Sequence, residues 1–99
     1  MSEDNSNRIL LDHSLTIQEV GEVMMQSRSA FEEATEIHLD IGSLVHIDGA
    51  GMQLLCAIIK EARTQSISLK WTGESEPLKT VAQAMGVDEW LGLNPIADN

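Results

Sequence analysis

In the middle of the chain, the hydrophobic pattern changes from period two to a helical period and then back to period two. Residues 36–41 alternate apolar and polar side chains, which places Ile37, Leu39 and Ile41 on one face of a strand. Residues 67–71 alternate in the same way. The segment between them is apolar around most of its helical circumference, which predicts a largely buried helix. A strand, a helix and a second strand in this order indicate an α/β domain with a right-handed crossover.

A strand and a helix are expected before this unit. Residues 9–11 are apolar and form a candidate strand. Thr16 and Glu19 have the spacing of a capping box, in which each residue satisfies a free backbone N–H of the first helical turn. The apolar side chains that follow recur at helical spacing and predict one buried stripe, made of Ile17, Val20, Met24 and Phe31.

The C-terminal third of the chain carries the start and stop patterns of one more helix. Ser75 is a favourable N-cap, and Pro77 lies in the first turn, where its missing N–H has no cost. Gly86 is expected to end the helix, because glycine adopts the left-handed conformation without strain. A short apolar segment follows and is expected to pack back on the core: Trp90, Leu91 and Leu93.

The 99 residues are enough for one hydrophobic core, and 42% of them are hydrophobic, as in an ordinary globular protein. We therefore expect one domain over residues 8–93, with a flexible N-terminus at residues 1–7 and a flexible tail at residues 94–99. No run of 18 or more apolar residues is present to form a membrane span, and the polar N-terminus has no signal-peptide pattern. These features predict a cytoplasmic protein.

The charge balance narrows the classes of partner. Six lysines and arginines against 16 aspartates and glutamates give a net charge of −10, which repels nucleic acid phosphates and anionic lipid surfaces. The acidic residues are spread along the chain, which is typical of solvated faces, although they would also attract a basic surface on a partner protein. Neither nucleic acid binding nor membrane insertion is expected.

The metal-binding and nucleophilic residue types are too dispersed to predict a metal or cofactor site. The three histidines are far apart in the sequence, and only His46 shares a strand face with Asp48. Cys56 is the single cysteine and falls on the apolar surface of the central helix, which favours an inert buried thiol. No nucleophile, base and oxyanion donor can be recognised together. We expect no cofactor, no metal and no enzymatic activity.

One motif concentrates what is distinctive in the chain. It runs from residue 39 to residue 51 and ends in Asp48-Gly49-Ala50-Gly51. Asp48 is placed to cap the central helix, because its carboxylate can accept a hydrogen bond from a first-turn N–H and is stabilised by the helix dipole. The three residues after it remove side-chain bulk, so a partner or an anion can approach the helix end closely. The same residues also suit a tight turn between a strand and a helix.

This motif resembles that of the STAS family (sulfate transporter and anti-sigma factor antagonist). In that family an apolar-Asp-apolar strand, here Leu39-Asp40-Ile41, leads to Asp-Ser-Ser/Thr-Gly and a helix. The likeness continues through the following helix, strand and helix and covers roughly residues 9–93. It implies an α/β domain with a small mixed sheet and helices packed mainly on one face, and a role as a switchable protein-binding module.

In the antagonist branch of the family, a kinase phosphorylates a hydroxyl in the positions held here by Gly49 and Ala50. Neither residue has a hydroxyl, so no phosphorylation is expected there. The resemblance leaves two roles open. One is an anti-sigma factor antagonist-like regulator that binds a kinase-like anti-sigma factor or a sensory complex, and the other is a small accessory subunit on the ATPase of an ABC-type transporter. In both, the expected partner-binding residues are Asp48, Gly49, Ala50, Gly51 and Gln53.

Overall fold

The computed structural model describes residues 8–93. The expected flexible ends, residues 1–7 and 94–99, lie outside the described residues. The elements follow one another as β1 (Arg8–Leu10), β2 (His13–Leu15), α1 (Val20–Glu33), β3 (Glu36–Asp40), β4 (Leu44–Ile47), α2 (Gly49–Thr64), β5 (Ser68–Thr72), α3 (Glu76–Met85) and α4 (Asp88–Leu91). None of the helices within residues 8–93 is long and apolar enough to cross a membrane.

The strands form two small sheets. A three-stranded sheet has the order β1-β3-β5, and β2 pairs with β4 separately. The STAS-like α/β fold class is confirmed, although all pairings between the described strands are parallel, so the expected mixture of strand directions is not found there. Parallel pairing follows from the connections, because a helix between successive strands returns the chain to the same end of the sheet.

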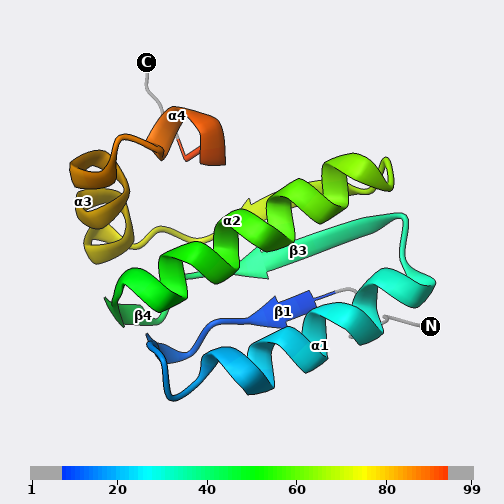
Figure 1. The fold of residues 1–99 in the computed structure, drawn as a ribbon, viewed down its shortest axis with the longest axis horizontal. Helices are drawn as coiled ribbons and strands as arrows, with labels where there is room; N and C mark the ends of the chain where they lie inside the picture. The colour runs from blue at the N-terminus through cyan, green and yellow to red at the C-terminus, as the bar shows by residue number, and fades with distance from the viewer. Residues whose placement is uncertain (1–7, 94–99) are drawn as a thin grey trace.

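The helices α1 and α2 lie side by side over one face of the three-stranded sheet (Figure 1). The strands alternate accordingly, because successive side chains of a strand point to opposite faces. Ile9, Ile37 and Leu39 point toward the helices and are fully buried. Arg8 and Lys70 point to the other face and are exposed. The expectation of helices mainly on one face is therefore confirmed for α1 and α2.

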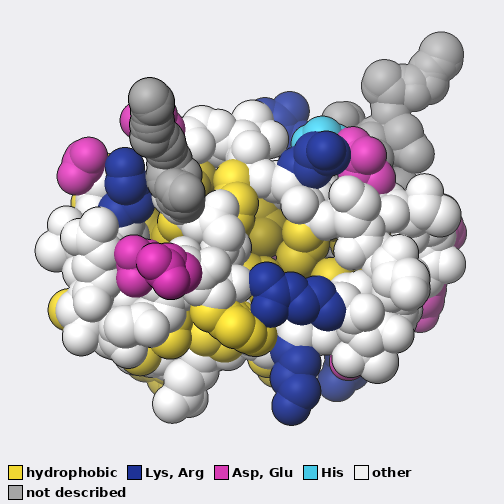
Figure 2. All heavy atoms as spheres, turned by 90° about the horizontal axis from the view of Figure 1, so that it is seen from above, with side chains coloured by type: hydrophobic (Ala, Val, Ile, Leu, Met, Phe, Trp, Pro, Cys, Tyr) yellow, Lys and Arg dark blue, Asp and Glu magenta, His cyan; other side chains and the backbone are white. Residues whose placement is uncertain are grey.

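One edge of the three-stranded sheet lies toward the top of Figure 1, and Figure 2 views the molecule from that side. Strand β5 lies at this edge, and β3 is its one partner strand within residues 8–93. Figure 2 shows hydrophobic side chains at the floor of a hollow on this face, with lysine and arginine side chains near it. The short helix α4 follows α3 and contacts β5 through the Trp71 indole N–H, which donates to the Leu91 carbonyl at 3.0 Å.

The predicted buried stripe of α1 is correct for Val20 and Phe31, which pack against the core, and wrong for Ile17 and Met24. The helix begins at Val20, so Ile17 lies in the turn before it and is 66% exposed. Met24 is also exposed, whereas the buried positions are Val23, Ser27 and Ala30. Ile17 and Met24 have helical spacing. Each lies one position along the chain from the face of α1 that packs on the core.

The predicted caps of the last long helix are confirmed. The Ser75 hydroxyl accepts from the Leu78 N–H at 3.2 Å and donates to the Leu44 carbonyl at 2.7 Å. It therefore joins the start of α3 to strand β4 as well as capping the helix. Gly86 ends α3 in the left-handed conformation, with φ of 74°. Leu91 packs into the core as expected, but Trp90 remains 40% exposed.

Candidate functional site

Asp48 lies between β4 and α2 and is the predicted N-cap of α2. Its Oδ1 accepts from the Gly51 N–H at 2.9 Å, and its Oδ2 accepts from the Ile17 N–H at 3.1 Å. One carboxylate thus fixes both the first turn of α2 and the segment before α1. These backbone hydrogen bonds, chiefly the one from Gly51, hold the pKa of Asp48 below its usual value despite an opposing effect of partial burial. The group is a charged structural link at ordinary pH.

Gly51 does not offer a surface to a partner, contrary to the expectation that residues 48–51 form an open helix tip. It is buried, and a Cβ added to it would lie 2.0 Å from the Leu15 carbonyl oxygen. No real Cβ atom approaches another heavy atom so closely. Gly51 is therefore required where the first turn of α2 crosses the end of β2. This contact, rather than access for a partner, explains the last glycine of the motif.

The other predicted partner-binding residues keep part of their surface open to solvent. Gly49 and Gln53, one helical turn apart, are exposed, and Ala50 and Asp48 are half-buried. No atom lies within 4 Å of a Cβ added to Gly49, so this position can carry a side chain without disturbing the fold. We call the group of Asp48, Gly49, Ala50 and Gln53 the α2-end surface.

Two apolar side chains beside the α2-end surface are not predicted from the sequence. Ile17, whose N–H is held by Asp48, is 66% exposed. Val45 in β4 is 45% exposed and lines a shallow groove of about 430 Å³ together with Ile47 and Pro77 of α3. Ile47 directly precedes Asp48, so the groove adjoins the same helix end. The arrangement places exposed apolar side chains next to a helix end with little side-chain bulk, as in a protein-binding surface.

The histidines do not form a metal site with the motif. His46 packs against His13 of the neighbouring strand β2, with the ring centroids 5.5 Å apart and the rings nearly perpendicular. The Asp48 carboxylate is directed instead to backbone N–H groups. Within residues 8–93, no group of three or more His, Cys, Asp or Glu side chains is placed to hold a metal ion.

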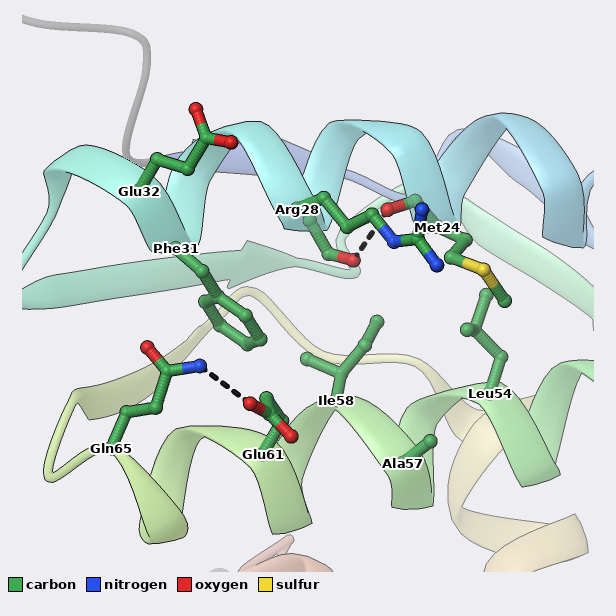
Figure 3. A pocket seen from close by; sticks show the side chains of 10 residues that line it. Met24, Arg28, Phe31, Glu32, Leu54, Ala57, Ile58, Glu61 and Gln65 are labelled. Atoms are coloured by element: carbon green, nitrogen blue, oxygen red, sulfur yellow. Dashed lines mark hydrogen bonds between the residues drawn. The ribbon is translucent and has the colours of Figure 1, made fainter.

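A larger groove of about 580 Å³ separates α1 from α2 (Figure 3). Phe31, Leu54 and Ile58 form its apolar floor, and Arg28 extends over one end near Met24. Its polar groups do not form a catalytic set. The Ser27 hydroxyl at the groove donates to the Met24 carbonyl at 2.8 Å, and the residues that line the groove include no histidine or cysteine.

Cys56, also on α2, fits the expected inert thiol. It is half-buried, and this burial raises the pKa of the thiol above its usual value. A raised pKa keeps the sulfur protonated near neutral pH, and the protonated form is a poor nucleophile. Neither Cys56 nor the residues that line the groove form a recognisable catalytic set.

Comparison with known proteins identifies the class of domain. A family described as "Mlab, STAS domain" matches residues 2–95, which is nearly the whole chain. No curated protein is matched. The matched range includes the α2-end surface and all nine elements of the fold.

Proposed function

The chain belongs to the STAS domain family, and from this membership we propose that it binds a protein partner through the α2-end surface as a non-enzymatic cytoplasmic regulator. Domains of this family are in general protein-interaction and regulatory modules. The observation that supports the choice of surface is the contrast within the motif. Asp48, which is half-buried, and Gly51, which is buried, hold the end of α2 in place, and this helix end presents Gly49 and Gln53 to solvent.

A preformed surface of this kind lowers the entropic cost of binding, because no loop has to be ordered when the partner arrives. Apolar contact area is available from the neighbouring Ile17 and Val45. The net charge of −10 and the carboxylate of Asp48 favour a basic surface on the partner that contacts the α2 end, since opposite charges accelerate association.

The proposed binding is not switched by phosphorylation at the family positions. Gly49 and Ala50 offer no hydroxyl oxygen to receive a phosphoryl group. A phosphate at such a place would add charge and bulk at the contact surface, which is how the modification releases a partner. Without an acceptor there, the complex formed by this chain is constitutive unless it is regulated at another position.

For the partner, our first candidate is a kinase-like anti-sigma factor or a sensory complex, with the chain acting as an antagonist-like regulator of a signalling circuit. A second candidate is the ATPase subunit of an ABC-type transporter, with the chain acting as an accessory subunit. The missing hydroxyls favour the second role to some extent, because a permanently docked subunit has no need of a partner-switching modification.

The test is an affinity capture from cells with three forms of the chain: wild type, Gly49→Ala and Gly49→Glu. Both substitutions have room in the fold, but only glutamate adds bulk and charge to the α2-end surface. We expect wild type and Gly49→Ala to capture the same partner and Gly49→Glu to lose it. A kinase-fold partner supports the signalling role, and an ATPase recovered with a permease supports the transporter role. Equal capture by all three forms would show that the partner binds elsewhere.

A further inference from the structure

A second surface, remote from the α2 end, lies along the open edge of β5. Within β5, the Ser68 N–H donates to the Thr35 carbonyl at 3.0 Å, and the Thr72 carbonyl accepts from the Ile41 N–H at 2.9 Å. Residues 68, 70 and 72 therefore direct their backbone groups toward β3. Because this direction alternates along a strand, Leu69 and Trp71 direct their N–H and C=O groups away from the sheet. These groups have no hydrogen-bond partner within residues 8–93.

An apolar hollow accompanies this edge on the helix side of the sheet. It has a volume of about 230 Å³, and the side chains of Leu69 and Trp71 form one wall of it. Ile59 of α2 and Leu91 of α4 form the others. The same two residues of β5 thus supply free backbone groups at the edge and apolar side chains beside it. A strand that paired with Leu69 and Trp71 would direct its own alternate side chains into the hollow.

Two basic residues lie beside the residues that have free backbone groups. Arg63 is the one charged residue that lines the hollow, where its guanidinium donates to the Trp90 carbonyl at 2.7 Å and stacks 4.6 Å from the centre of the Trp90 ring. Lys70, exposed on β5 between Leu69 and Trp71, points to the opposite face. Lys70 therefore places a positive charge between the two residues with free backbone groups, although Glu36 and Asp40 lie on the same face of the neighbouring strand β3.

Pairing of this edge with a second copy is disfavoured by Lys70. A two-fold antiparallel pairing that uses the free groups of both residues sets Leu69 opposite the Trp71 of the second copy. The two Lys70 side chains then face each other at a non-hydrogen-bonded position, where opposed side chains are closest. Like charges in direct opposition destabilise a pair of strands, and an edge lysine commonly protects a sheet from self-association.

We propose that the β5 edge binds an extended acidic segment of a partner protein by strand addition. In an antiparallel pairing, the residues of the segment opposite Leu69 and Trp71 are apolar and enter the hollow, and the residue between them is an aspartate or glutamate opposite Lys70. The recognised pattern is therefore apolar-acidic-apolar, which is complementary to Leu69-Lys70-Trp71 in both polarity and charge.

The proposal is tested by nuclear magnetic resonance on the full chain with two capped synthetic peptides that alternate valine and serine except at one central residue, which is glutamate in one peptide and lysine in the other. In the free protein, we expect the amides of Leu69 and Trp71 to exchange rapidly with solvent. On titration with the glutamate peptide these two amides should shift and become protected. The glutamate peptide should bind about fivefold more tightly than the lysine peptide, as expected for one exposed charge pair.

Charge reversal supplies the control. The Lys70→Glu variant should reverse the preference between the peptides, whereas Gly49→Glu, at the α2-end surface, should leave it unchanged. Failure of this proposal is thereby distinguished from failure of the proposed function. Slow exchange of Leu69 and Trp71 in the free protein would show that the edge is already covered, by a second copy or by the chain itself, and would overturn the proposal. Absence of binding at millimolar peptide, or equal affinity for both peptides, would overturn it as well.

Discussion

Replacing Gly51 with alanine tests why the motif ends in glycine. The new Cβ would lie 2.0 Å from the Leu15 carbonyl oxygen and 2.9 Å from the Leu15 carbonyl carbon, whereas tight Cβ contacts in proteins begin near 3.0 Å. The first turn of α2 and the end of β2 must therefore separate by about 1 Å. This movement also strains the Asp48 hydrogen bond to Ile17, which joins the same two segments.

Overpacking against backbone costs about 1–3 kcal/mol or more, and the better helix propensity of alanine returns at most about 1 kcal/mol. We therefore expect a net loss of about 1–2 kcal/mol, which lowers the Tm of a domain of this size by about 4–16 °C. The matched control is Gly49→Ala, whose Cβ meets nothing within 4 Å beyond its own helix turn and which should leave the free energy of unfolding unchanged or raise it by up to about 1 kcal/mol. Urea denaturation measures both. A Gly51→Ala variant as stable as Gly49→Ala would refute the assigned contact with Leu15.

Three further perturbations test other parts of the structure. Leu55→Ala removes a fully buried side chain of α2 and should lower the free energy of unfolding by about 2–5 kcal/mol. Met25→Ala, which truncates an exposed side chain, should lower it by less than about 0.5 kcal/mol. Similar losses for both variants would contradict the assigned core. Ser75→Ala removes the cap of α3 and leaves the Leu44 carbonyl without its side-chain donor. Urea denaturation should therefore show a free energy of unfolding that is lower by about 1–3 kcal/mol. The control Ser29→Ala, on the exposed side of α1, should not show this loss. Because the pKa of Asp48 is lowered in the folded state, its ionised form stabilises the fold at any pH above the usual aspartate pKa. This contribution is lost as the pH falls through the folded-state pKa. The stability difference between wild type and Asp48→Asn should therefore be largest near neutral pH and shrink in acid, and a constant difference would contradict the role given to the charge.

The parts of the fold that repeat a clear hydrophobic period could be predicted from the sequence. Strand β3, helix α2 and the caps at Asp48 and Ser75 all follow local rules, because each depends on residues within a few positions of one another. Strand β2 could not be found in this way. It has three residues, and its pairing with β4 depends on contacts far away in the sequence.

The candidate site also combines a part that was predicted from the sequence with a part that was not. The cap formed by Asp48 is local and was predicted, but its second hydrogen bond comes from Ile17, which is 31 positions away. The glycines of the motif look alike in the sequence. Only the packing of α2 across Leu15 separates Gly51, which is buried by necessity, from Gly49, which is free. A sequence pattern indicates that small residues are needed at a helix end, but it cannot tell a contact within the fold from one with a partner.

The most direct test of the binding surface is hydrogen exchange on the chain in complex with the partner that it captures. Binding at the α2-end surface predicts new protection over residues 48–53, with exchange at the opposite end of α2, residues 61–64, unchanged. Protection elsewhere on the molecule, with residues 48–53 exchanging as in the free protein, would contradict the account.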